Sequence, residues 1–173
     1  MGDGAAPNSN VWYLLYTAPR AEKKTNLELL KKGFTTYLPL HKTLRQWSDR
    51  KKWIEEPLFK SYIFVKSNLS KYYDILNVPG IVKFVSFEKK PIVVREQEIA
   101  FIQMVLSNFP DLEAVNGRFE SGMNVEIIAG PLRGLTGQII EYKGKRTVSI
   151  ELATVGHSLL VQLPESKIKP IAL

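Results

Sequence analysis

Residues 130–137 read Gly-Pro-Leu-Arg-Gly-Leu-Thr-Gly, and this stretch carries the most specific local signal in the chain. Glycines at positions 130, 134 and 137 permit positive φ angles and close backbone approach, and Pro131 fixes one turn dihedral, so the stretch suits a tight turn between two strands. A phosphate-binding loop is the competing interpretation, but it needs a Lys-Ser or Lys-Thr pair and then a helix. The strand-like run 138–142 follows instead, which favours the turn. The turn residues are Gly130, Pro131, Gly134 and Gly137.

Four short β-prone runs surround this turn at regular spacing, namely 124–128, 138–142, 147–152 and 159–163. Short strands separated by turn residues are typical of a small barrel. Glycine and proline interrupt every stretch long enough for a helix, and in a helix interior they cost about 1 and about 3 kcal/mol respectively. We therefore predict an all-β barrel domain over 118–173.

The first two thirds of the chain alternate short strands with helices. A bulky, aromatic strand is predicted over Val11–Thr17, and a helix over 20–32 ends at Gly33, the position expected of a C-cap. Further predictions are strand-like runs over 34–42, 58–66, 81–87 and 91–94, a hairpin tip over 43–52, and helices over 70–77 and 95–107. This order predicts an α+β sandwich of helices against a sheet at 10–108, followed by a flexible linker at 109–117.

The composition is that of a globular protein, with 45% hydrophobic and 24% charged residues among 173. The absence of cysteine excludes disulfides, thiolate nucleophiles and zinc–thiolate sites. No apolar run reaches the length of a membrane span, and residues 1–10 lack the hydrophobic core of a secretion signal, so we expect a cytoplasmic protein. The net charge of +7 favours a polyanionic partner, although a basic surface that only serves solubility explains it equally well.

The sequence does not assemble a catalytic group. His41 and His157 are isolated, and the adjacent Glu55 and Glu56 point to opposite faces ahead of a proline. Such residues supply neither a nucleophile nor an oriented base. We therefore expect a protein that acts by binding, without enzymatic activity, cofactor or metal site.

Four separated segments of the chain resemble one family. The 130–137 stretch followed by an apolar strand is similar to the KOW motif, whose fold is an SH3-like barrel. Upstream, the runs Trp-Tyr-Leu-Leu-Tyr at 12–16, Glu-Pro-Leu-Phe-Lys-Ser-Tyr-Ile-Phe-Val at 56–65 and Val-Pro-Gly-Ile-Val-Lys-Phe-Val at 78–85 resemble landmarks of a NusG N-terminal domain. The resemblance covers roughly residues 11–171 and implies a transcription elongation or antitermination factor.

The resemblance is closer to specialised, RfaH-like paralogues than to housekeeping NusG. Housekeeping members usually read Phe-Phe-Pro-Gly-Tyr where this chain has Lys60 and Ser61 in place of Pro-Gly. The preferred prediction is therefore a monomeric antiterminator of particular operons that suppresses pausing or termination. General housekeeping NusG and a ribosome- or RNA-associated KOW protein are the alternatives, and binding to polymerase separates the latter from the other two.

The resemblance implies which side chains meet RNA polymerase. It assigns Leu14, Phe59, Tyr62 and Phe84 to an apolar depression that receives the clamp helices of the β′ subunit. Partly exposed aromatic anchors of this kind contribute about 2 kcal/mol each. The competing interpretation makes all four ordinary core residues; it is equally favoured for Leu14 and Phe84, whereas contact is favoured for Phe59 and Tyr62.

Two further partner contacts follow from the resemblance. A contact toward the polymerase β subunit falls on Tyr72 and Tyr73, within a Lys-Tyr-Tyr-Asp stretch that differs from the Thr-rich motif of the RfaH-like branch. A ribosomal protein or termination factor would contact Leu132, Leu135 and Val155, which we expect to be exposed near one end of the barrel.

Nine basic residues in two groups are the predicted nucleic-acid contacts. Arg20, Lys24 and Lys31 are spaced to form one stripe on the first predicted helix, with Lys23 beside it. The second group crowds the hairpin tip around Trp47 and Trp53 and consists of Lys42, Arg45, Arg50, Lys51 and Lys52. Rings stack on unpaired bases while cations neutralise phosphates, so the tip suits a single strand; a solvated charge run is the competing interpretation.

The family resemblance identifies that strand as the non-template DNA of the transcription bubble. Ala18 and Glu28 stand where the RfaH-like branch has a lysine and a histidine that read its DNA element. We therefore expect contact with DNA but predict no particular DNA sequence.

Overall fold

The computed structural model describes residues 9–110, 112–117, 119 and 122–171. The expectation about a secretion signal falls mostly on residues 1–8, and the predicted start of the barrel falls on residue 118; both lie outside the described residues. The chain divides into two compact units, one formed by residues 1–40 and 59–101 and the other by residues 41–58 and 102–173. The predicted α+β class is confirmed. Among the described residues, no helix is long and apolar enough to cross a bilayer.

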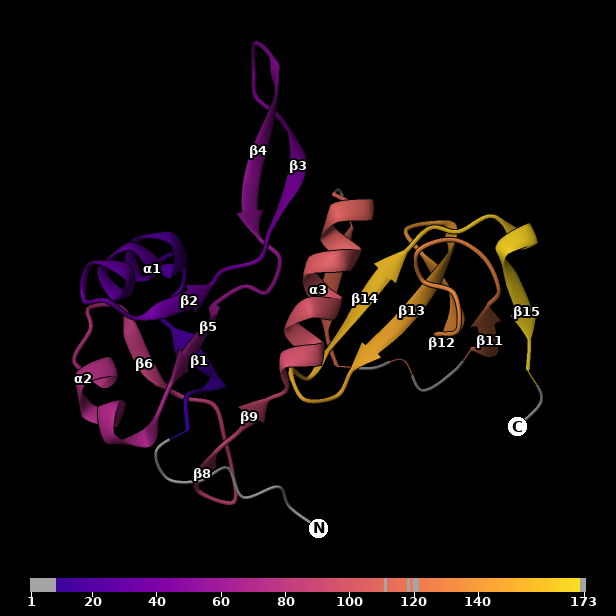
Figure 1. Ribbon diagram of the computed structural model, residues 1–173. Helices are drawn as coiled ribbons and strands as arrows, with labels where there is room; N and C mark the ends of the chain where they lie inside the picture. Colours follow the sequence, from indigo (N-terminus) through magenta and orange to yellow (C-terminus); the bar gives the residue numbers. More distant parts are fainter. Residues whose placement is uncertain (1–8, 111, 118, 120–121, 172–173) are drawn as a thin grey trace. The chain divides into compact units, whose positions relative to one another are not determined.

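The first unit is an antiparallel sheet packed against helices (Figure 1). The strand order is β2 (Thr35–Tyr37), β5 (Tyr62–Ser67), β1 (Val11–Thr17), β6 (Ile81–Phe84), and β9 (Val93–Val94) also pairs with β1. Leu29 of α1 (Glu22–Lys31) and Ile75 of α2 (Tyr72–Leu76) pack on one face, against a core that comprises Tyr13, Leu15, Ile63, Val65, Val78 and Phe84. The predicted bulky strand therefore lies at the centre of the sheet and is buried.

Short elements complete the first unit. A 3₁₀ turn, η1 (Leu69–Lys71), precedes α2, and β7 (Ser86–Phe87) pairs with β8 (Lys90–Pro91) across a two-residue turn. The helix α3 (Glu96–Asn108) starts in this unit and ends in the other. Its start is fixed to the sheet by the Glu96 carboxylate, which accepts hydrogen bonds from Trp12 Nε1 at 2.9 Å and Lys66 Nζ at 3.0 Å.

Several boundaries differ from the sequence-based prediction, and three of these differences have a clear physical reason. The helix predicted from residue 20 starts at Glu22, because Arg20 has a left-handed φ of +64°. The run 34–42 is divided between β2 and the next strand at Leu38-Pro39, since proline donates no hydrogen bond to a ladder. The strand predicted from residue 58 starts at Tyr62, after a turn in which Ser61 has a φ of +65°.

The second unit contains a β-ribbon and a six-stranded antiparallel sheet (Figure 1). The ribbon consists of β3 (Leu40–Gln46) and β4 (Lys51–Pro57), and its tip is the predicted hairpin. The sheet is ordered β10 (Glu113–Asn116), β14 (His157–Val161), β13 (Lys145–Leu152), β12 (Thr136–Tyr142), β11 (Met123–Ile127) and β15 (Ile168–Pro170), with the 3₁₀ turn η2 (Glu165–Lys167) before β15. The C-terminal residues are thus in the predicted β form.

One of these strands lies where a flexible linker was predicted. β10 occupies residues 113–116 within 109–117 and pairs with β14, from Glu113 opposite Leu160 to Asn116 opposite His157. Pairing with β14, more than 40 residues away, stabilises this segment as a strand. The segment itself has no alternating pattern, so its sequence did not predict a strand. The predicted strands did not include β15 either.

The turn over 130–137 has the geometry that its glycines predicted. Gly130 and Gly134 have φ angles of +84° and +86°, and the Gly134 N–H donates to the carbonyl of Ile127 at 2.7 Å. Gly137 serves close approach instead, because a Cβ atom there would lie 2.6 Å from the carbonyl oxygen of Ser149 on the adjacent strand. The stretch is a strand connection, as expected, and β12 follows it.

Candidate functional site

Three of the four residues predicted to line an apolar depression are buried in the first unit. Phe59 is only 1% exposed and packs edge-on against Phe64, with ring centroids 6.1 Å apart. Leu14 has no exposed surface, and Phe84 is buried against Tyr13 and Tyr72. The expectation that Phe59 is a partly exposed anchor is therefore wrong, and for Leu14 and Phe84 burial favours the core interpretation. A partner that binds without rearranging the protein cannot bury a side chain that has no exposed area.

Tyr62 is the member of that group which reaches the surface. It is half-buried and forms an edge-to-face pair with Tyr16, with centroids 5.4 Å apart. Tyr16 lies opposite Tyr62 on one side and opposite Lys83 on the other, and Lys83 Nζ lies 6.0 Å from the Tyr16 ring centroid. We call Tyr62, Tyr16 and Lys83 the tyrosine row. Burial, and secondarily Tyr16, raises the pKa of the Tyr62 hydroxyl, so the ring presents a neutral phenol.

Sequence reasoning missed Tyr16 and Lys83. The alternation of β1 places Tyr16 on the same face as Trp12 and Leu14, and that signal was present in the sequence. The registers that set Tyr16 beside both Tyr62 and Lys83 join three strands distant in sequence, so no local pattern could reveal the row.

The two tyrosines predicted to contact the β subunit differ in exposure. Tyr72 is half-buried and stacks on Phe84, with centroids 4.6 Å apart, whereas Tyr73 is 75% exposed. Both rings lie on α2, and they meet edge-on at 5.3 Å. Of the pair, Tyr73 presents the larger surface to a partner.

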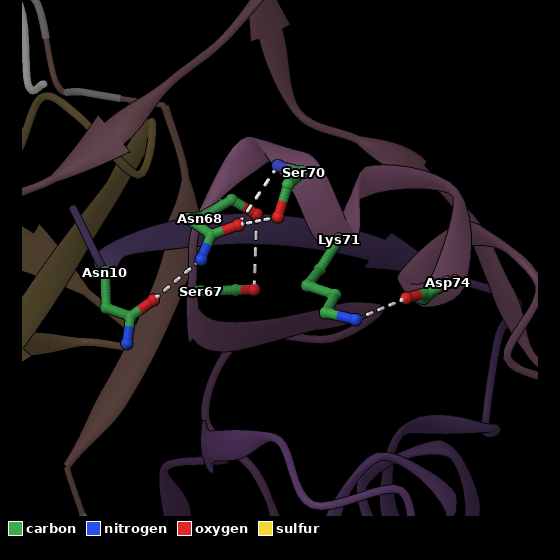
Figure 2. A network of polar contacts seen from close by, with 6 residues as sticks. All are labelled: Asn10, Ser67, Asn68, Ser70, Lys71 and Asp74. Carbon is green, nitrogen blue, oxygen red and sulfur yellow. Dashed lines mark hydrogen bonds and ion pairs between the residues drawn. The ribbon is translucent and has the colours of Figure 1, made fainter. Parts of the chain in front are cut away.

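A polar network holds the start of α2 (Figure 2). Asn68 Oδ1 accepts the backbone N–H of Ser70 at 3.1 Å and also the Ser70 hydroxyl, and Asn68 Nδ2 donates to Asn10 Oδ1 at 3.4 Å. Lys71 pairs with Asp74 at 3.2 Å. These contacts fix the 3₁₀ turn η1, directly ahead of the helix that carries Tyr73. Asn10, Asn68, Lys71 and Asp74 of this network also line a hollow of about 600 Å³, together with Lys32 and Lys66.

The first group of basic residues is exposed but does not form the predicted stripe. Lys23, Lys24 and Lys31 lie on α1, whereas Arg20 precedes the helix in a left-handed conformation. The stripe is corrected accordingly: β1 ends at Thr17 and α1 begins at Glu22 with Ala21 at its N-cap, so Arg20 lies outside the helix. Lys31 also pairs with Glu28 at 2.8 Å, and its hydrogen bond lowers the pKa of the Glu28 carboxyl.

The second group lies on the β3–β4 ribbon, whose two strands are joined by a tight turn (Figure 1). The Trp47 N–H donates to the carbonyl of Arg50 at 2.8 Å, which closes the turn. Trp47 and Trp53 are 56% and 59% exposed, and the five cations Lys42, Arg45, Arg50, Lys51 and Lys52 are all exposed. Arg45 pairs with Glu56 at 2.5 Å. Lys42, Trp53 and Pro110 line a hollow of about 620 Å³ beside the ribbon.

The predicted partner face of the C-terminal sheet is largely buried. Leu132 and Val155 have almost no exposed surface, and Leu135 is half-buried. Leu132 lies in the 130–134 turn, where the Arg133 N–H donates to the Gly130 carbonyl and the Leu135 N–H donates to the Leu132 carbonyl, and its side chain is buried. The expectation that all three are exposed is therefore wrong, and Leu135 retains an accessible surface.

A sequence model of the family described as transcription termination factor nusG matches residues 10–103, which are 94 of the 173 residues. The chain belongs to the NusG family. It is 24% identical over 177 residues to the transcription termination/antitermination protein NusG of Rickettsia felis, covering 94% of this chain and 91% of the relative. The corresponding protein of Campylobacter jejuni is 26% identical over 184 residues, covering 95% and 99%.

The fold of this NusG-family chain is shared with a solved structure. That structure, described as domain interaction in Thermotoga maritima NusG, has a TM-score of 0.57 at 24% identity and covers 94% of this chain and 98% of its own. NusG-family proteins are transcription factors rather than enzymes, so the predicted non-enzymatic character is confirmed by the family. These relatives carry the name NusG and do not distinguish a specialised branch.

Over the described ranges, no three His, Asp or Glu side chains lie close enough to hold a metal ion. His157 is buried in β14, and its Nδ1 donates to the carbonyl of Val155 at 2.9 Å, which fixes the neutral tautomer.

The second unit of this NusG-family protein is expected to lose stability as the pH falls below about 6.5, the ordinary His pKa. Burial lowers the pKa of His157, although its hydrogen bond to Val155 acts in the opposite direction. The unfolded chain therefore binds more protons below that pH, and the stabilising contribution is complete only above it. Urea unfolding from pH 7.5 to 5.5 measures the loss. His157→Asn, which keeps a donor, should remove that part of the slope; parallel curves for the two proteins would contradict the assignment.

Proposed function

We propose that this protein is an RfaH-like antiterminator of particular operons, which binds the clamp helices of RNA polymerase and contacts non-template DNA in the cytoplasm. The observation that carries the proposal is the β3–β4 ribbon, where two exposed tryptophans lie among five exposed cations. Aromatic rings and cations on one ribbon match the stacking surface and the phosphates of an unpaired strand. The family of transcription factors supplies the setting in which such a strand occurs.

The polymerase contact is proposed for the tyrosine row rather than for Phe59. Tyr62 and Tyr16 combine large apolar area with polar tips, and Lys83 adds one positive charge. Partly exposed tyrosines are favourable anchors because they bury much area at low entropic cost. Tyr73 is the proposed second contact, toward the β subunit. Residues 10–108 thus bind polymerase, and 118–173 form the KOW domain that recruits a ribosomal protein or termination factor, with Leu135 in its contact face.

The specialised role is supported by Lys60-Ser61, which replaces the Pro-Gly of housekeeping members. Transcription on two templates tests it: one carries the leader of the operon that contains this gene, and the other carries a ribosomal-RNA leader. A specialised factor suppresses termination on the first alone, whereas equal effects on both identify a general NusG.

Replacing Tyr62 by alanine is expected to weaken binding to core RNA polymerase by about 2 kcal/mol, roughly thirtyfold. The reason is the loss of a half-buried aromatic anchor from the tyrosine row. Fluorescence anisotropy of the labelled full-length protein measures the affinity, and circular dichroism verifies the fold. The matched control is Phe87→Ala, which removes an exposed aromatic side chain of the same unit from outside the row. Equal affinities of Tyr62→Ala and Phe87→Ala would reject the clamp-helix assignment.

A further inference from the structure

The buried face of α1 carries two polar side chains that reach turns on other parts of the first unit. Glu22 is 6% exposed, and its Oε1 accepts the backbone N–H of Ser61 at 2.7 Å. Thr25 is also buried, and its hydroxyl donates to the carbonyl of Pro79 at 3.1 Å. A carboxylate is rarely this buried without a strong hydrogen-bond partner, so the hydrogen bond from Ser61 explains the burial of Glu22.

Ser61 belongs to a turn over residues 59–62 that needs this hydrogen bond. The Tyr62 N–H donates to the carbonyl of Phe59 at 3.3 Å, and Ser61 occupies the third position with a φ of +65°, which is the pattern of a type II turn. The third position favours glycine, because in the left-handed region a Cβ atom comes too close to the following carbonyl oxygen. With serine there, the turn needs support from outside, and the hydrogen bond from Ser61 N–H to the Glu22 carboxylate is of the strong, charge-assisted kind.

The supported turn sets the position of Tyr62. β5 starts at Tyr62, directly after the turn, so any shift of Ser61 moves the first residue of the strand. The Ser61 carbonyl accepts the N–H of Thr17 at 2.8 Å, which joins the same turn to the end of β1, next to Tyr16. Two of the three members of the tyrosine row are therefore adjacent to groups that the Glu22–Ser61 contact holds.

The third member is held by α1 in the same manner. The turn 78–80 precedes β6, and the Ala18 N–H donates to the carbonyl of Gly80 at 2.9 Å. A Cβ atom at Gly80 would lie 2.0 Å from Thr25 Oγ1, so the helix packs directly on this turn. Lys83 follows it on β6.

We infer that Glu22 is a positioning residue that holds Tyr62 in the orientation that RNA polymerase binds. The inference rests on the proposed function. It assigns to a buried acid on α1 an effect on partner affinity, although Glu22 itself presents almost no surface to a partner. Its serine partner at position 61 makes the assignment testable, since glycine at that position adopts the turn without support.

A double-mutant cycle tests the inference. Glu22→Ala should weaken binding to core RNA polymerase about tenfold, because the support of the strained turn is lost. Glu22→Gln keeps an oxygen acceptor in place and should cost only about two- to threefold. Ser61→Gly alone should leave the affinity within about twofold, and the combination Glu22→Ala with Ser61→Gly should recover it to within about threefold of the original protein.

Two controls separate positioning from loss of stability and from failure of the proposed function. Leu29→Ala removes a fully buried side chain from the same helix and should leave the affinity unchanged at temperatures where circular dichroism shows a folded protein. A tenfold loss in Glu22→Ala that Ser61→Gly does not restore, or unchanged binding in Glu22→Ala while Tyr62→Ala is impaired, overturns the positioning role alone. Unchanged binding in Tyr62→Ala overturns the proposed polymerase surface.

Discussion

Replacing Phe59 by alanine is expected to destabilise the first unit by about 3–5 kcal/mol, the usual cost of removing a fully buried phenylalanine. The ring is 1% exposed and packs against Phe64, so its removal leaves a cavity next to the strand β5. Urea unfolding of the full-length protein, followed by circular dichroism, measures the change. The expected result is a transition at markedly lower urea concentration, and polymerase binding falls only because the protein unfolds.

Phe87→Ala is the control for this measurement. Phe87 is 71% exposed on β7, so its loss should change the free energy of unfolding by no more than about 0.5 kcal/mol. If Phe59→Ala unfolded at the same urea concentration as Phe87→Ala but lost polymerase affinity, Phe59 would be a contact residue after all.

Reversing the charge of Lys51 and Lys52 to glutamate is expected to weaken binding to single-stranded DNA on the order of fiftyfold at 50 mM salt. Each phosphate contact to a single strand adds about 0.7 to the slope of log affinity against log salt concentration, so two lost contacts flatten that slope by about 1.4. Both lysines are exposed on β4, next to Trp53. Binding of a labelled oligonucleotide, measured from 50 mM to 500 mM salt, gives the slope directly.

The matched control reverses two exposed lysines of the C-terminal sheet, Lys145 and Lys169. Both double variants lower the net charge from +7 to +3, because each lysine-to-glutamate change removes two charges. The control should keep the original slope. Identical slopes in the two double variants would show that overall charge, and not the ribbon, attracts the DNA.

Most elements of the fold were predictable from local patterns, whereas the strands β10 and β15 were not. The glycines at 130, 134 and 137, the bulky run of β1 and the polar hairpin between aromatic strands each carry their own signal, since turn geometry and alternation act over a few residues. Exposure was not predictable in the same way. Phe59, Leu132 and Val155 are buried in the folded chain, whereas the alignment of motifs gives only their position along the chain.

The supporting residues of the candidate site were hidden for the same reason. In the sequence, Glu22 is one acid at the start of a helix, where acids are favoured by the helix dipole. Only the packing of α1 on the turn 59–62 brings its carboxylate to Ser61, 39 positions away. Arg20 shows the opposite error, because a helix predicted two residues too long placed it on a stripe that it does not join.

The central place of β1 has a consequence for synthesis on the ribosome. Its partners β5, β6 and β9 are all encoded later, and β9 ends at Val94, 77 residues after Thr17. At about 5–20 residues per second, a nascent chain carries this apolar segment for roughly 4 to 15 s before its last partner has been made. During that interval Val-Trp-Tyr-Leu-Leu-Tyr-Thr is a hydrophobic strand whose pairing is incomplete, of the kind that chaperones shield from aggregation.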